Sequence, residues 1–355
     1  MTYGIGQTSL IRAKNIEKIW GIDELYLKLE GENPTGTHKD RLAIQHVDDA
    51  IIRNYDTITV GSCGNYGVAM SFVARESNLD CKVFLPKKYT GENVEQMKRY
   101  GSEVTRVDGG YEESVKKSRE MAEKNGWYDA NPGNKNTPIS MVAYVDIAEE
   151  IQEELNETPK TISVPVGNGT TLAGIHLGFR LLWRKNRSKD IPIMLAASSL
   201  GNNAIIETID KNSKDILQLD AEDIVETEIN EALLNWRSLD GQEAVNAIYD
   251  TGGIGVGLTD EDMLYYKKLL REEEDVSCLP TSAAALGALD EYLNRNGNRN
   301  GNRNGNRNGN GNRNGNRNGN RNRNGNRNGN RNGNRNGNRI DGKHVVVITS
   351  GVKDV

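Results

Sequence analysis

The sequence predicts an α/β protein built from two open parallel sheets. The first observation is that short β-branched strands alternate with longer helical stretches along most of the chain, an order typical of parallel sheets covered by helices. The second is that glycine-rich turns join a strand to a helix at 61–65 and at 167–171. The third is that the alternation stops at one low-complexity tract, 294–339, and resumes after it.

The first half of the chain supplies four strand and helix pairs. Strands are expected at 25–29, 56–60, 81–86 and 103–107, and helices at 40–52, 68–75, 92–100 and 112–125. The helix at 40–52 has its apolar residues on one face, and Gly126 ends the helix at 112–125. These elements predict one sheet with helices on its faces.

The second half continues the alternation. Strands are expected at 161–166, 191–197 and 343–348, and helices at 141–155, 172–185, 260–274 and 282–293. The low-complexity tract therefore falls in a single connection from a helix to a strand.

The tract Asn294 to Arg339 contains only Asn, Arg and Gly. It has nothing to bury, so we expect it to be disordered. The whole chain carries a formal net charge of -5, and subtracting the tract's twelve arginines leaves -17 for the remainder. An acidic body argues against a nucleic-acid surface on the folded part. The tract itself either contacts RNA or is a tolerated expansion in a surface loop.

Cysteine and histidine usage indicates the compartment. Three cysteines without metal-ligand spacing, and four histidines scattered singly, predict neither a disulfide framework nor a metal site. The sequence shows no secretion signal and no apolar run of membrane-spanning length. We therefore expect a cytoplasmic protein that does not contact a membrane.

Lys39 is the first candidate for chemistry. It follows a Pro/Gly-rich turn, 31–37, and lies directly before the helix predicted at 40–52. The positive end of the helix dipole disfavours a cation there, which would lower the amine's pKa and make it a better nucleophile. Taken alone, the same segment also fits a solvated lysine beside a turn. Asp40 and Arg41 are interpreted as a structural pair at the helix start.

Three further segments could meet a ligand. In 166–174, glycines and the following helix start direct N–H groups to one point, which suits a phosphate. The turn at 61–65 has the same form and would admit a carboxylate or phosphate. Thr349 and Ser350 follow the last strand, at the edge where open α/β sheets bind ligands. Each segment also has an ordinary interpretation, as a tight turn or a strand end.

The four motifs together resemble a known family. Asn33-Pro-Thr-Gly-x-x-Lys39-Asp-Arg, then Ser62-x-Gly-Asn65, then 165–169, then hydroxyl residues ending the last strand, form a pattern that resembles the pyridoxal-phosphate enzymes of fold type II. Segments 194–197, 258–261, 280–285 and 348–354 are similar to those of the threonine synthases. His38 stands where threonine synthases usually have phenylalanine. A histidine at this position resembles the pattern of the tryptophan synthase β subunit.

The resemblance implies a role for each matching residue. Lys39 would form the Schiff base with pyridoxal 5'-phosphate, and Asn65 would bond the cofactor's 3-oxygen. The phosphate would be held by Gly167, Asn168, Gly169, Thr170 and Thr171. Thr349, or Ser350 because the loop is one residue shorter than usual, would face the pyridine nitrogen. The substrate carboxylate would be held by Ser62, Cys63, Gly64 and Asn65, with His38 beside the substrate.

The resemblance also implies an architecture and an activity. Residues 1–40, 130–293 and 340–355 would form a large cofactor-binding domain, 41–129 a smaller mobile domain, and 294–339 a disordered insertion. The activity would be that of a threonine synthase, a lyase that converts O-phospho-L-homoserine to L-threonine in a homodimer. One alternative is β-replacement on O-phosphoserine or O-acetylserine to make cysteine or cysteate. Another is a cofactor-binding protein with little catalysis and an RNA-contacting arginine tract.

Overall fold

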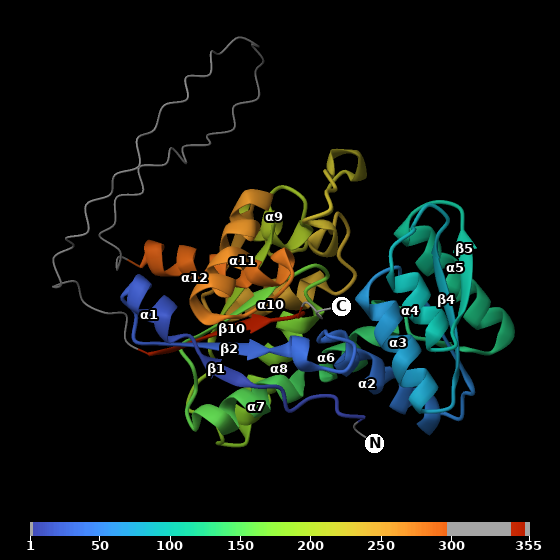
Figure 1. Cartoon of the computed structure of the whole chain (residues 1–355), viewed down its shortest axis with the longest axis horizontal. Helices are drawn as coiled ribbons and strands as arrows, with labels where there is room; N and C mark the ends of the chain where they lie inside the picture. The colour runs from blue at the N-terminus through green and yellow to red at the C-terminus, as the bar shows by residue number, and fades with distance from the viewer. Residues whose placement is uncertain (1–2, 297–341, 352–355) are drawn as a thin grey trace, which may run out of the picture.

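The computed structural model describes residues 3–296 and 342–351, which form two parallel sheets with helices packed against them (Figure 1). This confirms the predicted α/β class. The low-complexity tract lies outside the described residues from 297 onward, whereas its first two residues, Asn294 and Arg295, are the end of a helix.

The larger sheet has six strands in the order β1-β2-β10-β7-β8-β9. The strands are β1 (Leu10–Arg12), β2 (Glu24–Leu29), β7 (Thr161–Pro165), β8 (Ile193–Ser199), β9 (Ile254–Leu258) and β10 (Lys343–Ile348). Only β1 runs antiparallel to its neighbour. The last strand of the chain, β10, therefore lies in the middle of the sheet, between β2 and β7.

Both faces of this sheet are buried, and β10 shows how its side chains divide. Val345 and Val347 join the core with α7 (Val145–Leu155), α8 (Thr170–Arg184), α9 (Ala204–Asp210) and α10 (Gly241–Asp250). Val346 and Ile348 join a second core with α1 (Lys14–Trp20), α11 (Asp260–Glu274) and α12 (Pro280–Arg295). This alternation explains why the strand reads as a continuous apolar run.

The smaller sheet has four parallel strands in the order β5-β4-β3-β6. The strands are β3 (Thr57–Gly61), β4 (Asp80–Pro86), β5 (Glu103–Val107) and β6 (Tyr128–Asp129), and the helices beside them are α2 (Lys39–Ile52), α3 (Asn65–Glu76), α4 (Asn93–Arg99) and α5 (Tyr111–Asn125). Helix α5 packs against β3 and β4, and α2 packs against α3. The apolar face of α2 contributes Leu42, Ala43, Val47 and Ala50 to the core.

The predicted elements are found close to their expected bounds, and β5, α11 and β10 agree residue for residue. The single helix predicted at 141–155 is wrong. The structure has α6 (Thr137–Val142) and α7, separated by Ala143 and Tyr144. Helix α6 ends so close to α8 that a Cβ on Gly174 would lie 2.4 Å from the carbonyl oxygen of Met141. Tertiary packing thus breaks a helix that no glycine or proline marks.

Several elements were not predicted. They are β1, β6, β9, α1, α9 and α10, together with short 3₁₀ turns. Within the described residues, no helix is both long and apolar enough to cross a membrane.

Candidate functional site

Lys39 is the first residue of α2, and the turn before it is fastened to the end of β10. Thr37 forms a β-bridge with Ser350, and the backbone N–H of His38 donates to the carbonyl of Thr349 over 2.9 Å. The N–H of Thr35 donates to Asp40 over 2.7 Å, which closes the turn. The structure therefore brings together two predicted site segments that are more than three hundred residues apart in the sequence.

A buried ion-pair network holds the start of α2 in place. Arg41 donates two hydrogen bonds to Glu30, at 2.7 and 2.8 Å, and two to Glu150 at the same distances. Lys28 lies 2.7 Å from the second oxygen of Glu150. Burial acts to raise the pKa of Glu150, but the hydrogen bonds and charge of Arg41 outweigh it and hold this pKa at about 2. Charged groups paired in this way hold the backbone of α2 two residues after Lys39.

The amine of Lys39 faces the hydroxyl of Tyr144, with 3.5 Å between Nζ and Oη. Burial lowers the pKa of Lys39 to about 8, although the negative charge of Asp240 opposes the shift. Burial raises the pKa of Tyr144 far above its usual value. At neutral pH the tyrosine is thus a neutral hydroxyl, and the lysine is mostly protonated, with about a tenth present as the uncharged base.

His38 lies beside this pair and is neutral. Its Nδ1 is 3.0 Å from the carbonyl oxygen of Thr349, so Nδ1 carries the proton and donates. Its ring centroid is 5.5 Å from that of Tyr144. Burial, together with the charge of Lys39, lowers the pKa of His38 well below its usual range. His38 therefore supports the site as a fixed, uncharged ring.

The glycine-rich turn after β7 leads into α8 and presents free donors. The backbone N–H groups of Gly167, Asn168 and Gly169 have no acceptor among the residues that the structure describes. Gly169 has a φ of +83°, and a Cβ there would lie 2.6 Å from that of Ala244. Orphan N–H groups at the start of a fifteen-residue helix suit an anion, and we call these three groups the anion cradle.

The side chains of the same turn are already engaged. Thr170 donates to the buried carboxylate of Asp240, and Thr171 lies beside the hydroxyl of Tyr144 and acts to lower the pKa of that tyrosine against the effect of burial. The Asn168 side-chain oxygen accepts from Asn235 over 2.7 Å. An anion at this turn would thus be bound by backbone N–H groups, and Tyr144 lies between the turn and Lys39.

The carboxyl end of β10 carries a cluster of hydroxyls. Ser282, at the start of α12, has its Oγ 2.9 Å from Thr349 Oγ1 and 2.6 Å from Ser350 Oγ. All three side chains are buried. Both Thr349 and Ser350 thus share one partner, and the group available to a ligand at this point is a neutral hydroxyl.

The turn at 62–65 follows β3 of the smaller sheet. Gly61 before it donates from its N–H to Asn131 over 2.7 Å, and the hydroxyl of Ser62 accepts from the N–H of Gly67 over 3.1 Å. Burial raises the pKa of Cys63 to about 11, so its thiol stays protonated. Asn65 opens α3, and its partly exposed amide makes no hydrogen bond to the described residues. That amide is free to bind a ligand.

The site also contains residues that the sequence did not single out. Tyr144, Asp240 and Ser282 each join two predicted segments. Asp240 stands directly before α10 in a Leu-Asp-Gly sequence, a signal for a helix start that could have been noticed. For Tyr144 no comparable local signal exists, because it lies inside an apparently continuous helical pattern.

The assembled groups fit one kind of cofactor. The amine of lowered pKa matches an aldehyde, and the anion cradle of unpaired N–H groups matches a phosphate. The neutral hydroxyl cluster matches a ring nitrogen, and the free amide matches a phenolic oxygen. Among the described residues, no group of three or more His, Cys, Asp or Glu side chains could hold a metal ion.

Comparisons with known proteins agree with this set of groups. The family model described as "Pyridoxal-phosphate dependent enzyme" matches residues 1–303. A threonine synthase from Methanocaldococcus jannaschii is 30% identical over 290 residues, covering 81% of this chain and 70% of that protein. Serine racemase from Dictyostelium discoideum superposes with a TM-score of 0.72 at 18% identity, covering 99% of this chain and 94% of the other. Cysteine synthase from Entamoeba histolytica gives 0.64 at 17% identity, covering 98% and 86%. At these identities the two structures show the fold alone.

Proposed function

Since the chain belongs to the family of pyridoxal-phosphate dependent enzymes, we propose that it is a threonine synthase. It would eliminate phosphate from O-phospho-L-homoserine and add water to give L-threonine. The 30% identity to the Methanocaldococcus jannaschii threonine synthase over most of both chains supports this choice of reaction.

One observation carries the proposal on the structural side. An amine with a pKa of about 8 lies 3.5 Å from a neutral tyrosine hydroxyl, and the residue before it is bonded to Thr349 of the hydroxyl cluster. Such an amine can both attach a carbonyl compound and move a proton near neutral pH. Elimination and hydration of an amino acid need both abilities from the same group.

When bound, pyridoxal phosphate supplies an electron-withdrawing ring that stabilises negative charge on the substrate's α-carbon. Lys39 would attach the cofactor. The N–H groups of 167–169 would bind the phosphate, and Asn65 would bond the phenolic oxygen. Ser350 or Thr349 would bond the ring nitrogen. A hydroxyl there does not hold the nitrogen protonated as a carboxylate would, and this favours elimination and replacement over transamination.

The remaining residues act on the proton and the substrate. The free Lys39 amine would take the α-proton and return protons in later steps, with the neutral hydroxyl of Tyr144 accepting a hydrogen bond from the amine and orienting it. The turn 62–65 would bind the substrate carboxylate through its backbone and Ser62. We also propose that residues 41–129, which carry this turn, form the smaller domain. This domain would close on the substrate and exclude water until the step in which water is added.

The direct test is a substrate screen on the purified holoenzyme. With O-phospho-L-homoserine we expect phosphate and L-threonine to appear in equal amounts, and Lys39→Ala to abolish both. The wild type should show a visible absorption band of the bound cofactor that Lys39→Ala lacks. If only O-phosphoserine or O-acetylserine with a sulfur nucleophile turns over, the enzyme is a β-replacement enzyme and the proposal is wrong. Cofactor binding without turnover of any of these would contradict both.

A further inference from the structure

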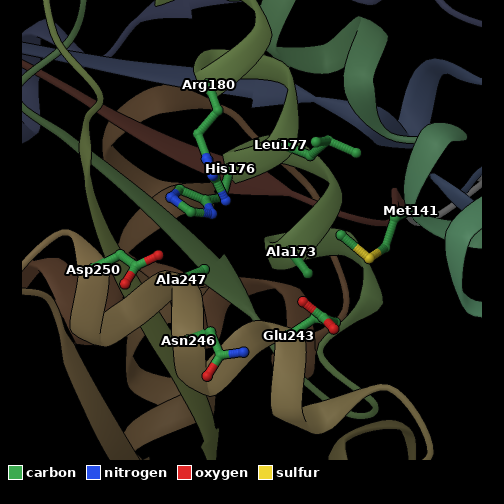
Figure 2. A pocket seen from close by; sticks show the side chains of 9 residues that line it. All are labelled: Met141, Ala173, His176, Leu177, Arg180, Glu243, Asn246, Ala247 and Asp250. Atoms are coloured by element: carbon green, nitrogen blue, oxygen red, sulfur yellow. The ribbon is translucent and has the colours of Figure 1, made fainter.

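A cavity of about 270 Å³, open to the protein surface, lies between α8 and α10, with Met141 of α6 at its side (Figure 2). It shares no lining residue with the cofactor site described above. Its volume is somewhat below the roughly 300–1,000 Å³ that drug-sized ligands occupy, so it suits a smaller molecule.

The spacing of residues on the two helices creates the cavity. Helix α8 lines it with residues 173, 176, 177 and 180, and α10 with 243, 246, 247 and 250, the i, i+3, i+4, i+7 pattern of one helix face. Small side chains, Ala173 and Ala247, stand on the two faces and leave room. Each helix therefore lines the cavity with one face, on which polar side chains surround a small apolar residue.

Four polar groups of the lining have no partner among the described residues. Arg180, Glu243 and Asp250 are exposed at the rim and form no ion pair and no hydrogen bond there, and the ring nitrogens of the buried His176 form no hydrogen bond. In Figure 2 the Arg180 side chain extends toward the His176 ring, while Asp250 lies on the other side of that ring. The charges of Arg180 and Asp250 both act on His176, which places the three groups at one end of the cavity.

This arrangement selects among ligand classes. Two carboxylates oppose a simple anion, and the Arg180 guanidinium opposes a simple cation. A molecule that carries both charges satisfies them together, because a carboxylate pairs with guanidinium and imidazole N–H while an ammonium pairs with a carboxylate. The centre of the cavity is apolar, with Ala173, Ala247 and Leu177.

We propose that the cavity binds a free α-amino acid with a short side chain. The ligand carboxylate contacts Arg180 and His176, and its ammonium group contacts Asp250. Its side chain lies along Ala173 and Leu177 toward Glu243. This site is separate from the proposed active site, and its existence does not depend on which reaction the enzyme catalyses.

Titration calorimetry on the holoenzyme tests the proposal, with L-threonine and L-isoleucine as probes. We expect at least one of them to bind. The affinity should fall about tenfold or more in Arg180→Ala and in Asp250→Asn, as loss of one charge-assisted contact implies. Arg184→Ala is the matched control, since Arg184 is an exposed arginine at the end of the same helix and does not line the cavity.

Two further measurements separate this site from the active site. Lys39→Ala should keep the affinity, because the amine is not in the cavity. The 2-hydroxy acid and the amine that correspond to each probe, each lacking one charge, should bind at least about tenfold more weakly. The proposal is wrong if neither probe binds, if Arg180→Ala binds as well as Arg184→Ala, or if Lys39→Ala alone removes binding. It is also wrong if Arg180→Ala changes the oligomeric state instead, since the face would then be an interface between copies.

Discussion

The hydroxyl of Thr170 donates a hydrogen bond of 2.7 Å to the carboxylate of Asp240, which is 2% exposed. Thr137 donates to the other oxygen of the same carboxylate over 2.6 Å. A negative charge is thus fixed at the start of α8, close enough to Lys39 to raise its pKa against the effect of burial.

Replacing Asp240 by asparagine removes that charge and keeps an acceptor for a threonine hydroxyl. We expect the pKa of Lys39 to fall below about 8, because burial then acts without the opposing charge. The measurement is the rate at which cofactor-free protein takes up pyridoxal phosphate as a function of pH. Its midpoint should move to lower pH in Asp240→Asn and stay in place in the exposed-site control Asp215→Asn. An unchanged midpoint would show that Asp240 does not act on the lysine.

Glu150→Gln should destabilise the fold strongly. It leaves Arg41 and Lys28 buried with an incomplete partner, which typically costs about 3–5 kcal/mol. Denaturant unfolding measures the loss. Glu153→Gln on the same helix is the control, since Glu153 is exposed, pairs with the exposed Arg187, and should lose at most about 1 kcal/mol. Equal losses in the two variants would contradict the role given to the network.

The same carboxylate predicts a pH dependence. The folded-state pKa of Glu150, about 2, lies below the ordinary value of 4.5. Its contribution to stability is therefore complete above pH 4.5 and disappears as the pH falls toward 2. The free energy of unfolding of the wild type should decline across this window, and the decline should be shallower in Glu150→Gln. Parallel curves would argue against this assignment.

Gly169→Ala should impair cofactor binding. The new Cβ would lie 2.6 Å from the Ala244 Cβ and 2.7 Å from Ile205 Cδ1, at a φ of +83°. Strain and overpacking of this kind each cost about 1–3 kcal/mol, and the N–H cradle must shift to relieve them. Gly201→Ala provides the comparison, because it has a φ of +74° and nothing within 4 Å. Titration of cofactor-free protein with pyridoxal phosphate should show weaker binding only for Gly169→Ala.

Tyr144→Phe keeps the ring beside His38 and removes the hydroxyl that lies 3.5 Å from Lys39. We expect kcat for phosphate release to fall by roughly 10²-fold, the lower end of the range for a group that assists proton transfer. The cofactor absorption band should persist, which separates this effect from loss of the cofactor. A variant with wild-type kcat would remove Tyr144 from the mechanism.

The sequence could predict the parts of this site that are local in the chain. Lys39, the turn at 167–171 and the hydroxyls after β10 each stand at a junction that turn chemistry and periodicity identify. Tyr144 and Asp240 could not be found in this way, because their contacts cross 105 and 70 residues. The break between α6 and α7, which places Tyr144, results from the contact with Gly174 of α8 and not from any residue at the break.

The central position of β10 also determines the order in which the chain can fold. Strands β2 and β7 become neighbours of the same strand only when Lys343–Ile348 has been synthesised, after the whole Asn/Arg/Gly tract. Until then, the sides of β2 and β7 that will pair with β10 are unpaired strand edges. Such exposed edges favour association with other chains. During translation, the arginine-rich tract therefore emerges from the ribosome before the larger sheet can close.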